Sequence, residues 1–209
     1  MQHVLAWSKV HAIDCLYFAA DTAHAESTFL AQEAGFDLVG IKIVLDHTLN
    51  DSITPETPHL RPYQPGDLDT LREIARSSYT ESRFFVDPHF TRERCEALYD
   101  VWITRSCTED YADHVLVAVQ NAAPAGYITC HLPQGAIPAR IGLVGVAASA
   151  QGLGLGGQLV NGAVRWLQDQ GTDYVTVTTQ GSNISAQRLY QRDGFRTNAV
   201  SLWYHRWFE

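Results

Sequence analysis

The chain lacks the features that mark several large classes of protein. No apolar run is long enough to span a membrane, and the N-terminus has no apolar signal core. The four cysteines are scattered without a CxxC pair, and the nine histidines form no HxxxH or HExxH pattern, so we expect reduced thiols, a cytoplasmic location and no metal. Lysine and arginine number 15 against 23 acidic residues, a formal net charge of −8, which argues against nucleic acid or an anionic membrane as partner.

The most informative segment present is a glycine-rich stretch between a predicted strand and a predicted helix. The β-branched residues Ile141–Val146 indicate the strand, VGVAASAQGLGLGG over Val144–Gly157 forms the stretch, and the apolar-periodic run Gln158–Gln170 indicates the helix. Backbone N–H groups at a helix start lack partners within the helix, and the helix dipole adds partial positive charge there. Glycines let that backbone approach a ligand, so the segment predicts a phosphate or pyrophosphate site. A tight strand–helix turn without ligand is the alternative.

The loop differs from two common phosphate-binding loops. It contains no lysine, which excludes the GxxxxGK[ST] loop of nucleoside triphosphatases. It is not a GxGxxG within an N-terminal strand–helix–strand unit, which disfavours a dinucleotide fold. Residues 151–156 instead read Gln-Gly-Leu-Gly-Leu-Gly.

A second motif follows a strand predicted over Tyr174–Thr179. Residues 183–195 read NISAQRLYQRDGF. Asn183 can cap a helix, and Gly194 can end it in a left-handed turn. Tyr190 lies in the middle of this short helix, where packing is the usual role of a tyrosine.

Together the two motifs resemble those of the GNAT acetyltransferase superfamily, Q/R-x-x-G-x-G/A followed by N-x-x-A-x-x-x-Y-x-x-x-G-F. The resemblance implies that the loop holds the pyrophosphate of acetyl-CoA and that Tyr190 is the general acid. The cofactor-binding residues that it implies are Val144, Gly145, Val146, Gln151, Gly152, Leu153, Gly154, Leu155, Gly156, Gly157 and Asn183.

The resemblance also implies the fold class, α/β (α+β), with a mixed, mostly antiparallel central sheet flanked by helices. With 45% hydrophobic and 18% charged residues, the chain suits one large or two small domains. Three prolines among polar residues over 46–62 indicate a linker. We therefore expect a small N-terminal α/β domain over residues 1–50 and an acetyltransferase domain over 58–209. The other expected elements are strands Ile13–Ala19, Phe36–Leu45, Leu60–Tyr63, His114–Val119, Tyr127–His131 and Val200–Phe208, with helices at His24–Ala34, after Asp67, and at Thr91–Arg105.

The N-terminal part contains an echo of the second motif. Residues 29–36, FLAQEAGF, parallel residues 188–195, RLYQRDGF, and a predicted strand follows each. Ala31 stands where the second copy has Tyr190. We interpret residues 1–50 as a partial, non-catalytic half-copy of the acetyltransferase fold; chance recurrence of helix–Gly-Phe–strand is the alternative.

Two further strings, Ser82–Pro88 (SRFFVDP) and Ala139–Leu143 (ARIGL), make the chain similar to the dTDP-fucosamine acetyltransferase group. That resemblance implies a small-molecule amine as partner, a nucleotide-linked amino sugar first of all, and leaves a homodimer open. Arginine suits a substrate diphosphate, so Arg83 and the neighbouring Phe84 are candidate acceptor-binding residues. A solvated or ion-paired arginine and core aromatics are the alternatives.

The chemistry of amine acetylation assigns further roles. The resemblance implies that a backbone N–H near Gly145 or Val146, where the sheet splays in this superfamily, stabilises the oxyanion that forms when an amine attacks a thioester. A thiol has a pKa near ~8.5 and a tyrosine near ~10, so Tyr190 can stay protonated and give its proton to the leaving thiolate. His131 is a candidate substrate-side base acting through water, with a strand-end surface histidine as the alternative.

Three functions follow from these patterns. The first is an acetyl-CoA-dependent N-acetyltransferase acting on a nucleotide-linked amino sugar. The second is the same chemistry on an antibiotic, a polyamine or a protein N-terminus. The third is a non-catalytic CoA-binding module, against which the intact Tyr190 and the intact loop both argue.

Overall fold

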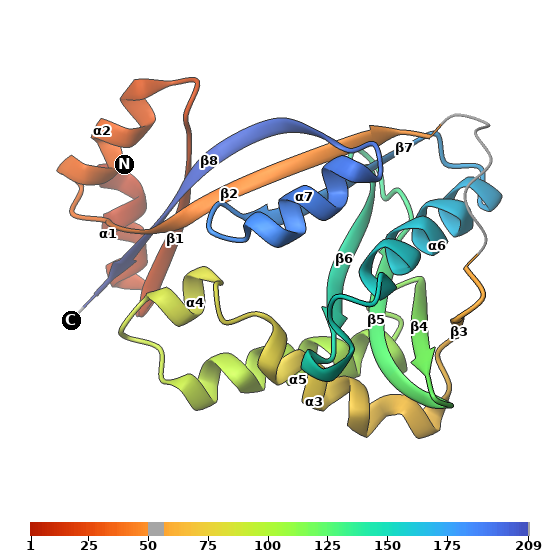
Figure 1. The fold of residues 1–209 in the computed structure, drawn as a ribbon. Coiled ribbons are helices and arrows are strands. Elements are labelled where there is room, and N and C mark those ends of the chain that lie inside the picture. Colours follow the sequence, from red (N-terminus) through yellow and green to blue (C-terminus); the bar gives the residue numbers. More distant parts are fainter. Residues whose placement is uncertain (50–56, 209) are drawn as a thin grey trace.

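A computed structural model of the protein describes residues 1–49 and 57–208. One eight-stranded sheet runs through it, in the order β1-β8-β2-β7-β6-β5-β4-β3 (Figure 1). Every neighbouring pair is antiparallel except β6 and β7, which are parallel. The expected mixed, mostly antiparallel sheet is therefore confirmed. In sheet order the strands are β1 Cys15–Asp21, β8 Arg196–Trp207, β2 Asp37–Thr48, β7 Tyr174–Gln180, β6 Ala139–Val146, β5 Ala123–His131, β4 His114–Gln120 and β3 Leu60–Pro62.

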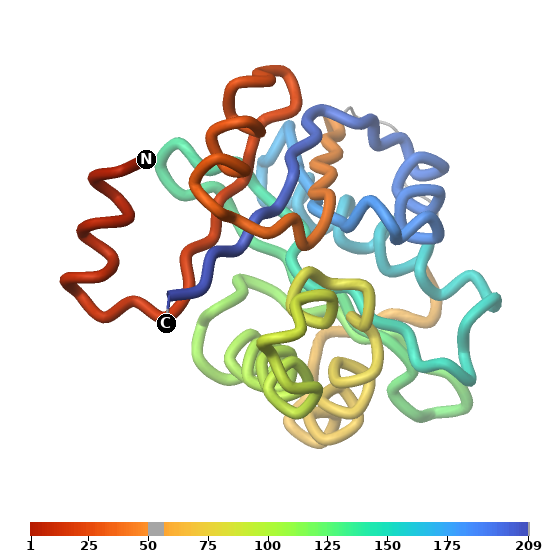
Figure 2. The backbone as a smooth tube through the Cα atoms, turned by 90° about the vertical axis from the view of Figure 1, so that its left-hand side faces the viewer, coloured from red at the N-terminus to blue at the C-terminus, as the bar shows by residue number. Residues whose placement is uncertain are grey.

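Helices cover both faces of this sheet. Helices α3 (Leu68–Ser78) and α5 (Arg92–Thr108) lie together on one side, and α6 (Leu155–Asp169) and α7 (Ile184–Arg192) lie on the other (Figure 2). Successive residues of a strand point to opposite faces, and Tyr127 and Ile128 of β5 accordingly belong to two different cores. Helices α1 (Gln2–Val10) and α2 (Ala25–Glu33) lie at the β1 end of the sheet, and the short α4 (Arg83–Val86) lies beneath β2.

Helix α1 was not expected from the sequence. Three of its large apolar residues, Val4, Trp7 and Val10, are 49%, 53% and 81% exposed, and Leu5 packs against the core, so most of its apolar positions do not mark a buried face. The connection between the predicted strands His114–Val119 and Tyr127–His131 is also shorter than expected. Asn121 and Ala122 adopt positive φ of 50° and 64° and close a tight hairpin turn, and β5 starts directly after them.

The boundaries of several strands also differ from expectation. Strand β2 continues to Thr48, through the first residues of the predicted linker, and residues 50–56 of that linker lie outside the described part. Strand β8 begins at Arg196, earlier than predicted. In the described ranges, no helix combines the length and the apolar character needed to cross a membrane.

The strands of two strand–helix–strand units are interleaved at one end of the sheet. The units are β1–α2–β2 and β7–α7–β8, and β8 lies between β1 and β2 while β2 lies between β8 and β7. Their helices end alike: Phe36 N–H donates to Ala31 O, and Phe195 N–H to Tyr190 O, both at 3.0 Å. The half-copy interpretation and the division into two domains both stay predictions, with this likeness in favour of the former.

Candidate functional site

Strands β6 and β7 pair at one end and then separate. Ala139, Arg140 and Ile141 of β6 pair with Val175, Thr176 and Val177 of β7, and no later residues of the two strands are paired with each other. Strand β6 continues to Val146 along β5, while β7 continues to Gln180 along β2. The later part of β6 therefore presents a backbone edge without a neighbouring strand.

Alternation along β6 decides which backbone groups face that edge. Ala147 N–H donates to Ala125 O at 2.8 Å, so residue 147, and with it residue 145, points toward β5. Val144 and Val146 then point toward the side of β7. Of the two N–H groups expected to stabilise an oxyanion, that of Gly145 is directed at β5 and that of Val146 faces the unpaired edge.

A β-bulge in β6 lies where the pairing with β7 ends. The register against β5 shifts between Ile128 and Cys130, and Leu143 N–H donates to the Thr129 hydroxyl at 2.8 Å. Gly142 fits this bulge because a Cβ there would lie 2.5 Å from His131 Nε2 and 2.6 Å from Thr129 Oγ1. Bulges bend and twist a strand, which accounts for the separation of β6 from β7.

The glycine-rich loop leads from this edge to an open helix start. Gly154 is the N-cap of α6 with φ +78°, no side chain caps the helix, and its first turn has no acidic residue. A Cβ on Gly152 or Gly154 would meet nothing within 4 Å, so the backbone is accessible there. Gln151 Nε2 donates to Val146 O at 3.4 Å, which ties the loop to β6. Free N–H groups, helix dipole and absent side chains fit an anion such as a pyrophosphate.

Helix α7 packs beside the first turn of α6. A Cβ on Gly156 would lie 3.3 Å from Leu189, which shows how close the helices come. One carboxylate lies near: Asp193 Oδ2 would be 3.9 Å from a Cβ on Gly157, and burial raises the pKa of Asp193. Asn183 accepts a hydrogen bond from Ala186 N–H at 3.0 Å, so its predicted capping of α7 is confirmed.

Tyr190 lies on the inner face of α7. Its side chain is only 4% exposed, and its ring centre lies 5.7 Å from that of Phe195 in the core shared with α6. Burial raises the pKa of Tyr190 well above the usual range, so the hydroxyl stays protonated. Tyr190 therefore packs in the core, and its protonated hydroxyl is also able to donate a proton.

Two tyrosine hydroxyl groups lie beneath β6. Tyr79 and Tyr127 Oη are 3.0 Å apart, and a Cβ on Gly145 would lie 2.9 Å from the Tyr127 ring. Tyr79 also stacks on Tyr99, with ring centres 4.3 Å apart. Burial, then Tyr127 and then Tyr190 raise the pKa of Tyr79, so Tyr79, Tyr127 and Tyr190 lie in one region. The sequence analysis missed Tyr127, since only the Tyr127–Gly145 register brings it to the site.

Arg83 and Phe84 lie on α4, which faces the sheet beneath β2. The Arg83 guanidinium carbon is 4.4 Å from the Phe84 ring centre and 3.9 Å from that of Trp203. Within residues 1–49 and 57–208 Arg83 forms no ion pair, so the ion-pair alternative does not hold there. Trp203 was not named as a candidate, because its contact depends on the placement of β8 beside β2.

His131 lies at the paired end of β6, opposite Arg140. Its side chain is buried, so the surface alternative was wrong, and burial together with Arg140 lowers its pKa to about 4. At about 3.3 Å per residue, Gly145 is roughly 15 Å further along β6 than Arg140. The low pKa and this distance both disfavour His131 as the base for an amine held at Val146.

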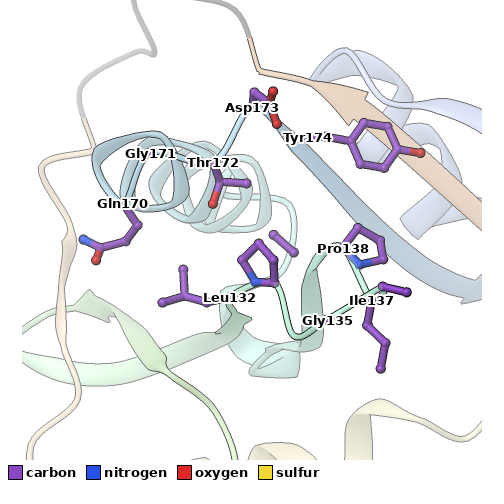
Figure 3. Close-up of a pocket in the computed structure, with 12 residues that line it drawn as sticks. Leu132, Gly135, Ile137, Pro138, Gln170, Gly171, Thr172, Asp173 and Tyr174 are labelled. Atoms are coloured by element: carbon purple, nitrogen blue, oxygen red, sulfur yellow. The ribbon is translucent and has the colours of Figure 1, made fainter.

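A hollow of the molecule lies at the paired end of β6, away from the glycine-rich loop. It is formed by the β5–β6 connection and the α6–β7 connection, with Leu132, Ile137, Pro138 and Tyr174 among its lining (Figure 3). It adjoins the start of β6, and none of the predicted site residues lines it. In the part of the chain that the structure describes, no group of three His, Cys, Asp or Glu residues could hold a metal ion, and the absence of a metal stays a prediction.

Comparison with known proteins agrees with this geometry. The model of the acetyltransferase (GNAT) family matches residues 68–195, from α3 through the turn after α7. The chain belongs to this family. It is 31% identical over 170 residues to the spore coat polysaccharide biosynthesis protein SpsD of Bacillus subtilis, covering 80% of the chain and 56% of SpsD. It is 26% identical over 202 residues to a dTDP-fucosamine acetyltransferase of Escherichia coli, covering 96% of the chain and 82% of that protein.

Solved structures share the fold at low identity. A tandem GNAT protein from the clavulanic acid biosynthesis pathway, solved without AcCoA, superposes with a TM-score of 0.66 at 14% identity, covering 98% of the chain and 67% of that protein. The chain thus spans little more than half the length of SpsD, and most of the length of the dTDP-fucosamine acetyltransferase.

Proposed function

We propose that this GNAT chain is an acetyl-CoA-dependent N-acetyltransferase acting on the primary amine of a small molecule, with a nucleotide-linked amino sugar as the preferred acceptor. The observation that carries the proposal is the continuity between the unpaired edge of β6 and the open start of α6. Gln151 joins the two through its bond to Val146 O. One ligand can therefore reach both the anion-binding backbone and a strand edge with free N–H groups.

The residues divide the work of acetyl transfer. Gly152, Gly154 and the first turn of α6 would hold the pyrophosphate of acetyl-CoA, which supplies an activated acetyl thioester. The Val146 N–H would donate to the oxygen that becomes negative when the amine attacks. Tyr190 would give its proton to the departing sulfur. Burial raises the pKa of Tyr190. The same lack of water raises the pKa of the departing thiol, so transfer of a proton from the tyrosine hydroxyl to the thiolate remains feasible.

The amine must be neutral to attack the thioester. Strand β6 carries no aspartate or glutamate, and His131 is buried at its far end. We therefore assign no base to the described residues and expect the neutral form of the amine to be the one that reacts. The rate should then rise with pH toward the pKa of the free amine.

The choice of acceptor rests on the relatives and on Arg83. One relative is named a dTDP-fucosamine acetyltransferase and another a spore coat polysaccharide biosynthesis protein. A half-buried arginine that forms no ion pair among the described residues is suited to a diphosphate. Both features favour a nucleotide-linked amino sugar over a polyamine, which carries positive charge.

The decisive experiment measures transfer with the whole chain. The protein is mixed with acetyl-CoA and thiol release is followed, first alone and then with nucleotide-linked amino sugars, aminoglycosides, polyamines and peptides. We expect thiol release and an acetylated product, confirmed by mass spectrometry, with an amino sugar. Binding of acetyl-CoA without transfer to any of these amines would instead indicate a CoA-binding module.

A further inference from the structure

Two cations contact one tryptophan at the end of the sheet that β1, β8 and β2 form. The Arg83 guanidinium carbon lies 3.9 Å from the centre of the Trp203 ring, and Lys42 Nζ lies 5.4 Å from it. Lys42 is on β2, Arg83 on α4 and Trp203 on β8. We call these three residues the Trp203 cluster. All three side chains are partly exposed, so a ligand can touch them.

Within the described residues, no ion pair neutralises the positive charges of the Trp203 cluster. Among the described residues neither Lys42 nor Arg83 forms an ion pair, although the chain has a formal net charge of −8 and only two lysines, Lys9 and Lys42. The buried carboxylate of Asp87 nearby accepts hydrogen bonds from His205, Trp207 and His89.

Arg83 itself is incompletely satisfied. Its Nε is buried without a hydrogen-bond partner, and burial lowers the pKa of its guanidinium. Partial burial of a cation that has no ion-pair partner carries a cost, and an anionic ligand would reduce that cost.

The Trp203 cluster lies near the end of β7, beyond the point where β7 stops pairing with β6. Gly40 separates Arg83 from Gln180, the last residue of β7: a Cβ on Gly40 would lie 3.9 Å from Arg83 Cβ and 3.6 Å from Gln180 Oε1. That Gln180 oxygen is also buried without a partner. On the other side, burial raises the pKa of Tyr99, and Arg83 is near enough for its positive charge to oppose that rise; the Tyr99 ring stacks on Tyr79. Tyr79 in turn bonds Tyr127 beneath Gly145.

We propose that Lys42 and Arg83, held by Trp203, bind the diphosphate of the acceptor, so that the N-terminal strand β2 contributes to substrate recognition. The inference rests on the proposed function and adds the location of the anionic part of the substrate. Phosphate oxygens accept hydrogen bonds from both cations, and the amine end of the same molecule extends past Gln180 toward Val146. Acetyl-CoA has its own phosphate site at α6, on a different element.

Calorimetry with thymidine diphosphate tests this directly. The full chain is titrated in the presence of saturating CoA, which blocks the α6 site, and uridine diphosphate and inorganic pyrophosphate are titrated in parallel. We expect binding of the diphosphates, with affinity reduced about tenfold or more in Lys42→Gln and Arg83→Met. Lys42→Arg should retain most of the affinity. Lys9→Gln removes the only other lysine of the chain, which lies on α1, and should leave the diphosphate affinity unchanged.

Three results would overturn the inference. The first is that no diphosphate binds to the CoA-saturated protein. The second is that Lys42→Gln and Arg83→Met bind diphosphate as tightly as the wild type does. The third is that CoA displaces the diphosphate. Equal affinity for pyrophosphate and thymidine diphosphate would support a site for the diphosphate alone, without contacts to the nucleoside. If acetyl transfer to an amino sugar is found while diphosphate binding is not, this inference fails and the proposed function stands. If diphosphate binding is found while transfer to every amine fails, the diphosphate site stands and the proposed function fails.

Discussion

The Asp87 carboxylate accepts a hydrogen bond from Nδ1 of the fully buried His205 at 2.6 Å. This contact joins the residue after α4 to the end of β8, and Trp207 Nε1 donates to the same oxygen at 2.9 Å. Burial alone would raise the pKa of Asp87, but the hydrogen bonds that it accepts lower it to about 2. Burial lowers the pKa of His205, so the pair is a carboxylate and a neutral imidazole near pH 7. Helix α4, and with it Arg83, is thus held against the sheet.

Replacing Asp87 by Asn should therefore destabilise the protein. An amide has one acceptor oxygen, and its NH₂ group would face the donors that now reach the carboxylate. We expect a loss of about 1–3 kcal/mol in the free energy of unfolding, measured by urea denaturation. Asp69→Asn is the control, because the Asp69 side chain is 94% exposed and its contact with Arg72 is a surface pair. Equal stability of the two variants would contradict this account.

His131 should make stability depend on pH. Its pKa is about 4 in the folded protein, and an unfolded histidine has a pKa near ~6.5. The neutral ring contributes its full stability above about pH 6.5, and that contribution is lost as pH falls toward 4 because the unfolded chain takes up the proton first. One such proton corresponds to about 1.4 kcal/mol per pH unit. Urea unfolding at pH 7, 6 and 5 should show a shallower pH slope for His131→Gln than for the wild type. Parallel slopes would show that His131 does not cause the dependence.

A negative charge at the start of α6 should weaken acetyl-CoA binding. Gly154→Asp places a carboxylate beside the free N–H groups that would hold the pyrophosphate, so affinity should fall tenfold or more, about 1.4 kcal/mol or above. Gly154→Asn is the matched control, since asparagine has the same shape, no charge, and tolerance for the positive φ at this position. Calorimetry giving equal affinity for both folded variants would remove the cofactor assignment.

The Tyr190 hydroxyl is tested by removing only its oxygen. Tyr190→Phe keeps the ring that packs on Phe195, so melting temperature and acetyl-CoA binding should change little. If the hydroxyl protonates the leaving thiolate, kcat should fall by roughly 10²–10⁴-fold, with the lower end favoured because a thiolate is a tolerable leaving group. Tyr204→Phe is the control, as Tyr204 is equally buried but lies in the core of the β1–α2 unit. Turnover within about threefold of wild type, with chemistry rate-limiting, would leave Tyr190 a packing residue only.

Local signals in the sequence predicted the local structure of the two motifs. The glycine loop, the Asn183 cap and the left-handed turn at Gly194, where φ is +90°, each depend on a few neighbouring residues. The register of distant strands carries no comparable signal. Tyr127 lies beneath Gly145, and Trp203 beside Gly40, only because of pairings between β5 and β6 and between β2 and β8. The positions of Arg83 and His131 could not be predicted for the same reason, since their surroundings come from other elements.

The interleaving of strands from the two units constrains the order in which the sheet can form. Strand β8 is the last along the chain, yet it lies between β1 and β2, the first two. On a ribosome, β1 and β2 would emerge early and wait with unpaired edges for the C-terminal segment. Such edges are open to other chains until they are filled, and contacts between the two ends of a sequence form slowly. We therefore expect the chain to depend on a chaperone that binds these edges during synthesis. A fold whose strands pair in sequence order would not have this dependence.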